Sequence, residues 1–197
     1  RMDWIPDEVA NVTLPPVSAL IYENNRTVVA KKYKRRIRNY SVSIDNPPKF
    51  IAKVVREKLI NHQILVDGIS EPGVTPPAAL MIHEVKVPLI EAIKFINKNS
   101  DNFMAECLFK TIGAETSGEQ GNSFYSQQAI LSYISDNSIY SQGTSLVDGS
   151  GISRFDEITV AALVGVLENM YFDLSNFEAF YNSLSIAGMD GTLRSRF

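Results

Sequence analysis

The chain has 197 residues, of which 45% are hydrophobic and 21% charged, and its formal net charge is -3. This composition is ordinary for a soluble globular protein, large enough for one domain or one domain plus a smaller piece. The mild acidic balance gives no reason to expect a nucleic-acid partner. No run approaches the roughly 18–20 apolar residues that a membrane span needs.

The cysteine content and the first residues give little information about the cellular compartment of the protein. Cys107 is the single cysteine, so an internal disulfide is excluded, and its place in an apolar helical pattern predicts a core residue. The opening residues have no signal-peptide character. We therefore expect either a cytosolic protein or one from which a leader has been removed.

Residues 1–45 are predicted to be rich in β-structure. Short β-branched or aromatic runs alternate with turn sequences, and these runs are residues 12–14, 18–22, 27–30 and 40–44. The basic run 31–38 predicts a solvated strand and turn. A binding face for an anionic polymer such as cell wall is the alternative for that run.

After residue 45 the pattern becomes mainly helical. Asp45-Asn46-Pro47-Pro48 is a helix-start signal, and we expect the helix after it to stop near Asn61. Residues 64–69 favour a strand entering a turn, and 78–82 form a weaker strand pattern in a Pro-rich stretch. Further helices are predicted at 88–98, 102–112, 124–135, 159–171 and, shorter, near 177–184. These changes place a domain boundary near residue 45, giving domains 1–45 and 46–197.

The best candidate for a catalytic or binding motif is Asn99-Ser100-Asp101-Asn102, which lies between two helical patterns. Ser100 and Asn102 are thereby placed on a turn, where short polar side chains project sideways. A hydroxyl and an amide can each donate and accept hydrogen bonds without carrying charge. Ser-Asp-Asn after a helix is the middle element of the Ser-x-x-Lys, Ser-Asp-Asn, Lys-Thr-Gly set of penicillin-recognising serine enzymes. The alternative is that Ser100 and Asn102 only cap the next helix.

Three further strings accompany this motif, and they are 47–68, 146–154 and 183–197. Their order and spacing resemble the D-alanyl-D-alanine carboxypeptidase/endopeptidase family, the class C low-molecular-mass penicillin-binding proteins, from about residue 45 to the C-terminus. The resemblance implies an α/β (α+β) fold that forms the helix-rich part of a β-lactamase/transpeptidase-like domain. Residues 1–45 would be the end of an inserted β-rich domain.

The resemblance also implies a function. The parent protein would be a serine-type D-Ala-D-Ala carboxypeptidase/endopeptidase that acts on peptidoglycan stem peptides through an acyl-enzyme, in the periplasm or the extracellular cell envelope. β-Lactams would be covalent inhibitors of the intact enzyme. Carried over, Ser100 would relay a proton toward the leaving amine and Asn102 would hydrogen-bond the substrate backbone, with Asp101 between them in the cleft.

A second loop would lie near the same cleft. The segment Asp148-Gly149-Ser150-Gly151 resembles the family's Asp-Gly-Ser-Gly loop, so Asp148, Gly149 and Ser150 are cleft-loop candidates. The alternative is a phosphate-type nest, since paired glycines allow backbone amides to converge. In the C-terminal string, Gly188 and Gly191 are expected to fix a turn, with Asp190 hydrogen-bonding inside it.

Two family motifs are absent from the sequence. No serine is followed three residues later by lysine, and residues 110–113 are a broken Lys-Thr-Gly inside a predicted helix. We expect a central piece of a longer enzyme, inactive alone, with exposed apolar surface and a tendency to self-associate or to bind complementing chain segments. The alternatives are a β-lactamase-like hydrolase and a non-catalytic peptidoglycan-binding or scaffolding protein.

No metal site or cofactor is expected. His62 and His83 have no partner spacing with cysteine or acidic residues. The two histidines are isolated and give no Ser-His-Asp arrangement, which argues against a chymotrypsin-type catalytic triad.

Overall fold

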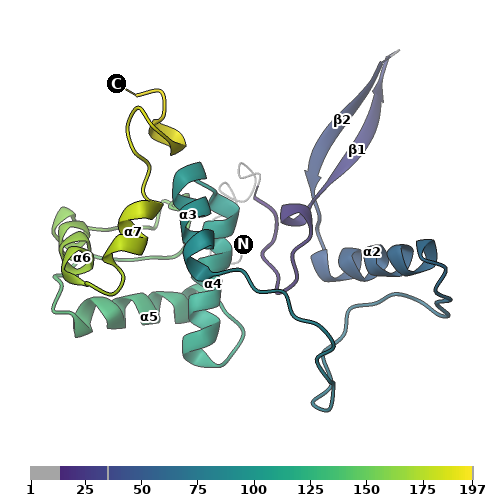
Figure 1. Cartoon of the computed structure of the whole chain (residues 1–197), viewed down its shortest axis with the longest axis horizontal. Coiled ribbons are helices and arrows are strands. Elements are labelled where there is room, and N and C mark those ends of the chain that lie inside the picture. Colours follow the sequence, from purple (N-terminus) through teal and green to yellow (C-terminus); the bar gives the residue numbers. More distant parts are fainter. Residues whose placement is uncertain (1–13, 35, 197) are drawn as a thin grey trace. The chain divides into compact units, whose positions relative to one another are not determined.

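The structure is a computed structural model that describes residues 14–34 and 36–196. Its contacts divide the described residues into two compact units, one within 14–85 and the other within 86–196 (Figure 1). The first unit therefore contains the described part of the predicted β-rich segment, from residue 14 on, and the helix after it. The domain boundary near residue 45, which concerns the family's inserted region, stays a prediction.

The first unit combines a hairpin with one helix. Strands β1 (Arg26–Tyr33) and β2 (Arg36–Ser43) form a two-stranded antiparallel sheet in which Lys31 lies opposite Arg38. These strands confirm the predictions at 27–30 and 40–44. The basic run is a solvated strand pair and turn, because its described side chains are exposed.

Helix α2 (Pro47–Asn61) begins and ends where the sequence predicts. The Asn46 side chain accepts a hydrogen bond from the Lys49 backbone N–H at 3.1 Å, and proline occupies the first helical positions. The cap satisfies a backbone donor that has no partner inside the helix, and the proline ring is tolerated there because it lacks such a donor.

The predicted strand at 18–22 is wrong. This segment instead turns around Asn25, the last residue of the short 3-10 helix η1 (Glu23–Asn25), whose side chain is fully buried. The Asn25 amide donates to the carbonyl of Pro16 at 2.8 Å and to the Ser18 hydroxyl at 3.0 Å. Because a single buried amide satisfies several polar groups of one loop, the segment closes on itself rather than extending.

The strands predicted at 64–69 and 78–82 are also absent from the described residues. Leu65 and Ile82 are 86% and 98% exposed, and neither segment pairs with another strand in that part of the chain. Apolar composition favours a strand only where a neighbour supplies the backbone hydrogen bonds and a surface to cover. Of the strand predicted at 12–14, only Leu14 lies within the described residues, and it is in a loop.

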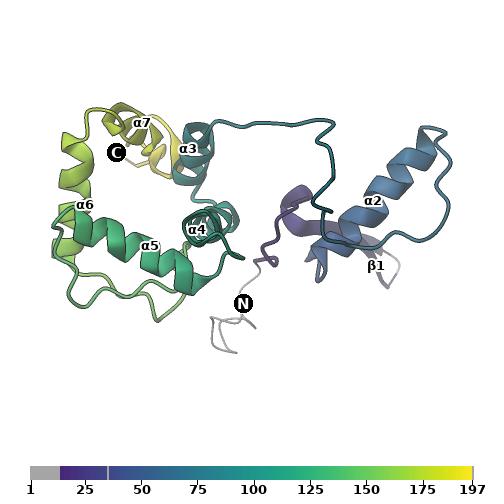
Figure 2. The ribbon, with the colours of Figure 1, turned by 90° about the horizontal axis from the view of Figure 1, so that it is seen from below.

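The second unit is helical and confirms all five helices predicted for it. The helices are α3 (Leu89–Asn99), α4 (Asn102–Ser117), α5 (Ser123–Asp136), α6 (Val160–Phe172) and α7 (Phe177–Ser183), followed by the 3-10 turn η2 (Gly191–Leu193). Helix α4 packs on α5, and α3 packs on α7 and η2 (Figure 2). The broken motif at 110–113 lies inside α4, as the sequence predicts. No helix in the described ranges has both the length and the apolar character needed to cross a bilayer.

The α4–α5 contact holds much of the buried centre of this unit. Phe103 and Phe109 of α4 and Ile134 of α5 are each at most 4% exposed. The fully buried Ser126 hydroxyl donates to the carbonyl of Phe109 at 2.7 Å. A Cβ atom at Gly113 would lie 2.5 Å from the Ser126 hydroxyl oxygen, so this close helix approach requires glycine.

Large apolar side chains are also exposed, as the sequence leads us to expect. On α6, Val160, Leu167 and Phe172 are 77%, 52% and 69% exposed. Exposed apolar area on this scale is typical of a surface that another element covers. Self-association or binding of complementing segments stays a prediction.

Candidate active site

A short turn joins α3 to α4 and carries the sequence Ser100-Asp101-Asn102. Ser100 ends α3 with a left-handed backbone, at φ 52° and ψ 50°. Asp101 caps α4, because its carboxylate accepts a hydrogen bond from the Met104 backbone N–H at 2.9 Å. Asn102 is the first residue of α4. A serine in the left-handed region costs about 1 kcal/mol, and such strain is found where the surrounding structure enforces it.

The side chains of Ser100 and Asn102 do not hold this turn together. Ser100 is exposed and Asn102 half-buried. Among the residues that the structure describes, neither the Ser100 hydroxyl nor the Asn102 carboxamide makes a hydrogen bond. Asp101 performs the capping, so the alternative that Ser100 and Asn102 only cap α4 is wrong for their side chains.

A second Ser-Asp-Asn tripeptide, residues 135–137, lies at the end of α5. Here the Asn137 carboxamide donates to the carbonyl of Tyr133 at 2.8 Å and accepts from the Asn169 side chain at 3.1 Å. The amide is therefore used to end one helix and to join it to another. The sequence holds a signal that separates the two copies, since a helical pattern comes directly after the first copy and a loop after the second.

The Asp148-Gly149-Ser150 candidates lie in a loop that folds around the Asp148 carboxylate. Asp148 is 5% exposed and accepts hydrogen bonds from the backbone N–H groups of Ser150 at 3.0 Å, Gly151 at 2.6 Å and Ser153 at 2.7 Å. This is a tight loop closed by an aspartate side chain. Because the carboxylate already occupies these amides, they do not form the phosphate-type nest that was the alternative.

Glu106 of α4 binds the same loop from the other side. The residue is buried, and its carboxylate accepts from the backbone N–H groups of Gly149 and Ser150, both at 2.9 Å. Burial raises the pKa of the Glu106 carboxyl above its ordinary value, and the Asp148 carboxylate adds to this. Glu106 was missed from the sequence because its partners are 43 and 44 residues away.

The approach of this loop to α4 depends on Gly149. A Cβ atom at that position would lie 2.5 Å from Cβ of Phe109 and 2.7 Å from the carbonyl oxygen of Ala105. No larger residue fits without displacing backbone. The loop therefore lies against the same helix that begins with Asn102.

Asp156 is the third carboxylate that binds this loop, after Asp148 and Glu106. Its carboxylate accepts from the backbone N–H groups of Val147 at 2.7 Å and Asp148 at 3.3 Å. Burial, together with the neighbouring Asp148 side chain, raises the pKa of Asp156 to about 6. Across residues 14–34 and 36–196, no group of three or more His, Cys, Asp and Glu side chains is arranged to hold a metal ion. These carboxylates fold a loop instead.

Cys107 is half-buried rather than fully buried. Burial raises the pKa of its thiol to about 12, and the carboxylates of Glu106 and Asp101 contribute. A thiol with this pKa is protonated at neutral pH, so Cys107 is a poor nucleophile.

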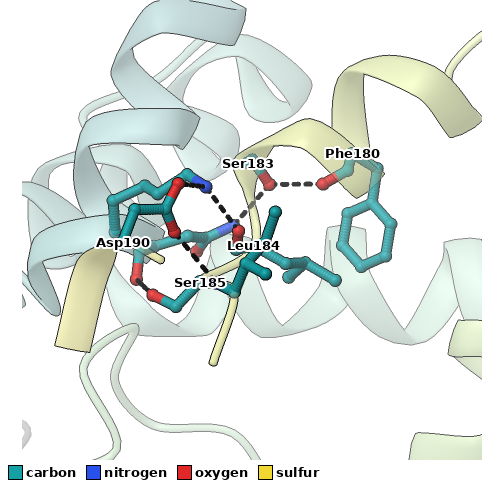
Figure 3. Close-up of polar contacts among 8 residues, drawn as sticks. Phe180, Ser183, Leu184, Ser185 and Asp190 are labelled. Carbon is teal, nitrogen blue, oxygen red and sulfur yellow. Dashed lines mark hydrogen bonds and ion pairs between the residues drawn. The ribbon is translucent and has the colours of Figure 1, made fainter. Parts of the chain in front are cut away.

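The last turn of α3 is bound to the C-terminal segment by a polar cluster (Figure 3). The Lys98 ammonium donates to the carbonyl of Leu184 at 2.7 Å and to the Asp190 carboxylate at 2.5 Å. Asp190 also accepts from the Ile186 backbone N–H at 2.9 Å, which confirms its predicted place inside this turn. The hydrogen bond from Lys98 holds the pKa of the Asp190 carboxyl below its ordinary value.

Comparison with known proteins relates the chain to one family. The model of the D-Ala-D-Ala carboxypeptidase 3 (S13) family matches residues 28–197. The chain is 24% identical over 183 residues to D-alanyl-D-alanine carboxypeptidase DacB of Haemophilus influenzae, covering 91% of this chain and 38% of that protein. It is 35% identical over 115 residues to penicillin-sensitive carboxypeptidase A of Dictyostelium discoideum, covering 55% of this chain and 21% of that protein.

The fold is similar to that of a solved penicillin-binding protein. The crystal structure of penicillin binding protein 4 (dacB) from Haemophilus influenzae, complexed with a β-lactam, superposes with a TM-score of 0.72 at 20% identity. The superposition covers 87% of this chain and 42% of that chain. The chain thus spans less than half the length of the relatives it matches. Since the family model covers most of its residues, the chain belongs to the D-Ala-D-Ala carboxypeptidase 3 (S13) family.

Proposed function

We propose that this chain supplies the Ser-x-Asn side of the cleft in a serine-type D-Ala-D-Ala carboxypeptidase/endopeptidase. The substrates are peptidoglycan stem peptides, and the protein acts in the periplasm or the extracellular cell envelope. The nucleophile lies outside these residues, because no Ser-x-x-Lys occurs among them. In the intact enzyme that nucleophile forms an acyl-enzyme with substrate and a covalent adduct with β-lactams. Membership of the family and the β-lactam complex of a structural neighbour support this proposal.

The observation that carries the proposal is that only one of the three side chains in the α3–α4 turn caps a helix. Asp101 caps α4, which leaves the exposed Ser100 hydroxyl and the Asn102 carboxamide without a hydrogen bond in the described part of the chain. Polar side chains on a rigid helix junction, spaced by one residue, suit a site that binds and protonates a substrate. A purely structural turn would use them for its own capping.

The chemistry needs a group that passes a proton without carrying charge. When the external serine attacks the D-Ala-D-Ala carbonyl, its proton passes to a base, and the amide nitrogen must gain a proton before the terminal D-alanine leaves. The Ser100 hydroxyl gives its proton to that nitrogen and takes one from the base, so it ends the step unchanged. The Asn102 carboxamide donates and accepts hydrogen bonds with the substrate backbone.

The test uses the full-length protein, the complete product of the gene. Acylation by a fluorescent penicillin is followed by stopped flow, and D-alanine release from a D-Ala-D-Ala peptide is measured in parallel. Ser100→Ala should lower the acylation rate constant by about 10²–10⁴-fold. Ser135→Ala, in the second tripeptide, is the matched control and should stay within about twofold of wild type.

Two results would overturn the proposal. One is a Ser100→Ala variant that acylates at the wild-type rate while its circular dichroism melt matches wild type. The other is a full-length protein that takes no covalent adduct from any β-lactam by intact mass, which would favour a non-catalytic peptidoglycan-binding protein.

A further inference from the structure

The end of α3 next to Ser100 is bound to residues far along the chain. Lys98 and Asn97 contact partners 86 to 92 positions later. Neither side chain has a part in the proton transfer described above. Building on the proposed function, we propose that Lys98 and Asp190 are positioning residues that set the place of Ser100 against the segment that ends at Asp190.

The Lys98 ammonium joins two points of that segment at once. It bonds the carbonyl of Leu184 and the Asp190 carboxylate, and Asp190 in turn bonds the backbone of Ile186. The Lys98 side chain is 14% exposed, whereas that of Asp190 is 44% exposed. A lysine drawn this far out of solvent is held in one place, so the turn from 184 to 190 and the end of α3 form one bonded unit.

Close backbone packing supports the same unit. Gly191 has φ +59°, and a Cβ atom there would lie 3.0 Å from the carbonyl oxygen of Lys98. Beside it, the Asn97 carboxamide donates to the hydroxyl of the fully buried Ser183 at 2.8 Å, and that hydroxyl donates to the carbonyl of Phe180 at 2.6 Å. The hydrogen bonds of Ser183 lie in the same polar cluster as Asp190 (Figure 3), and they act on the last turn of α3.

The position of Ser100 depends on these polar contacts because apolar packing constrains α3 weakly. None of the residues of α3 is fully buried. Ser100 follows Lys98 by two residues, and Asn99 between them bonds back to the carbonyl of Phe95 at 2.9 Å. A shift of the last helical turn is therefore passed directly to the Ser100 hydroxyl. Proton transfer requires hydrogen-bond distance, so a displacement of about 1 Å can cost on the order of 100-fold in rate.

A role of the Lys98–Asp190 pair in positioning Ser100 and a role only in stability predict different results. A partly exposed ion pair adds little to the free energy of folding, because solvent screens its charges. Loss of the pair should therefore slow acylation much more than it lowers the melting temperature. A residue with only a structural role would show the two effects in proportion.

The experiment measures the acylation rate constant of the full-length protein at saturating fluorescent penicillin, with the half-saturating concentration and the melting temperature. Lys98→Met and Asp190→Asn should each lower the rate constant about tenfold, with the half-saturating concentration nearly unchanged. The double variant should be no slower than Lys98→Met alone, because Lys98→Met already removes the bond to Asp190. Lys98→Arg should restore most of the rate, since it keeps the charge and the donors.

Lys94→Met is the matched control, because Lys94 lies one turn earlier on the same helix, is exposed and has only the smallest of the electrostatic effects on Asp190. It should acylate like wild type. The inference is overturned if Lys98→Met acylates normally while Ser100→Ala is slow, or if Lys98→Arg is as slow as Lys98→Met. It is also overturned if the loss of rate only follows a loss of melting temperature. A normal Ser100→Ala variant would instead overturn the proposed function.

Discussion

The chain contains Ser-Asp-Asn twice, and the two copies have different structures. Residues 100–102 separate α3 from α4, and their aspartate caps the second helix. Residues 135–137 finish α5, and there the asparagine side chain makes the hydrogen bonds. The residue types are identical, so the difference comes from the element after each copy, a helix in the first case and a loop in the second. A helix that begins at the third residue makes the aspartate its cap and leaves the serine and asparagine side chains for another use.

After the serine pair tested above, the largest expected difference is between the two asparagines. Asn102→Ala in the full-length protein should lower the acylation efficiency with penicillin by about 10–100-fold, because a hydrogen bond to the ligand is lost, with little change in melting temperature. Asn137→Ala should instead lower stability, since it removes hydrogen bonds to Tyr133 and Asn169. Its free energy of unfolding should fall by about 1–2 kcal/mol while acylation is unchanged. Equal effects of both variants on acylation would contradict the distinction.

The two aspartates should differ in stability. Asp101→Ala removes the cap on Met104 N–H and should lower the free energy of unfolding by about 1 kcal/mol. Asp136→Ala loses only a 3.4 Å hydrogen bond from Ser132 on an exposed surface, and should change it by less than about 0.5 kcal/mol. Chemical denaturation of the full-length variants measures both. If Asp136→Ala is the more damaging change, the assignment of the cap is wrong.

A pH effect is expected in the 147–156 loop, which packs on α4, the helix that begins with the first copy. The pKa of Asp156 is raised to about 6 from 3.8, so the folded state binds a proton more tightly than the unfolded chain. This contribution is fully present below pH 3.8 and is lost as pH rises through about 6. Because the carboxyl is partly exposed, it amounts to on the order of 1 kcal/mol or less.

Asp156→Asn mimics the protonated carboxyl and keeps an acceptor for the backbone N–H of Val147. The difference in unfolding free energy between this variant and wild type should therefore grow in favour of the variant as the pH rises from 3.8 to about 6. Urea unfolding across that range measures it. A difference that does not change with pH would show that Asp156 titrates normally.

The smallest effect concerns the two serines with left-handed backbones, Ser100 at φ 52° and Ser138 at φ 55°. Glycine relieves this strain but costs entropy in the unfolded chain, so each serine-to-glycine change should stabilise by only about 0.5 kcal/mol. Ser138→Gly should keep full activity, whereas Ser100→Gly should lose acylation despite its higher melting temperature. A Ser100→Gly variant that is both stable and active would contradict a role for the hydroxyl.

Secondary structure was predictable where the signals are local. The Asn46 cap, the prolines after it and the apolar periodicity of five further helices predicted their elements to within a few residues. The strands predicted at 18–22, 64–69 and 78–82 failed, because a strand needs a partner that composition does not identify. The buried Asn25 amide that turns the first of these segments has no distinct sequence signature.

The sequence by itself determined the helical frame, the helix junction at 100–102 and the family. The helices and the junction depend on short-range residue spacing, and the family resemblance depends on the order of four short motifs along the chain. Only the tertiary structure decided that Glu106 binds the Asp148 loop and that Lys98 binds Asp190. The physical reason is that these partners lie 43 to 92 residues apart, where packing, rather than local backbone preference, selects which donor meets which acceptor.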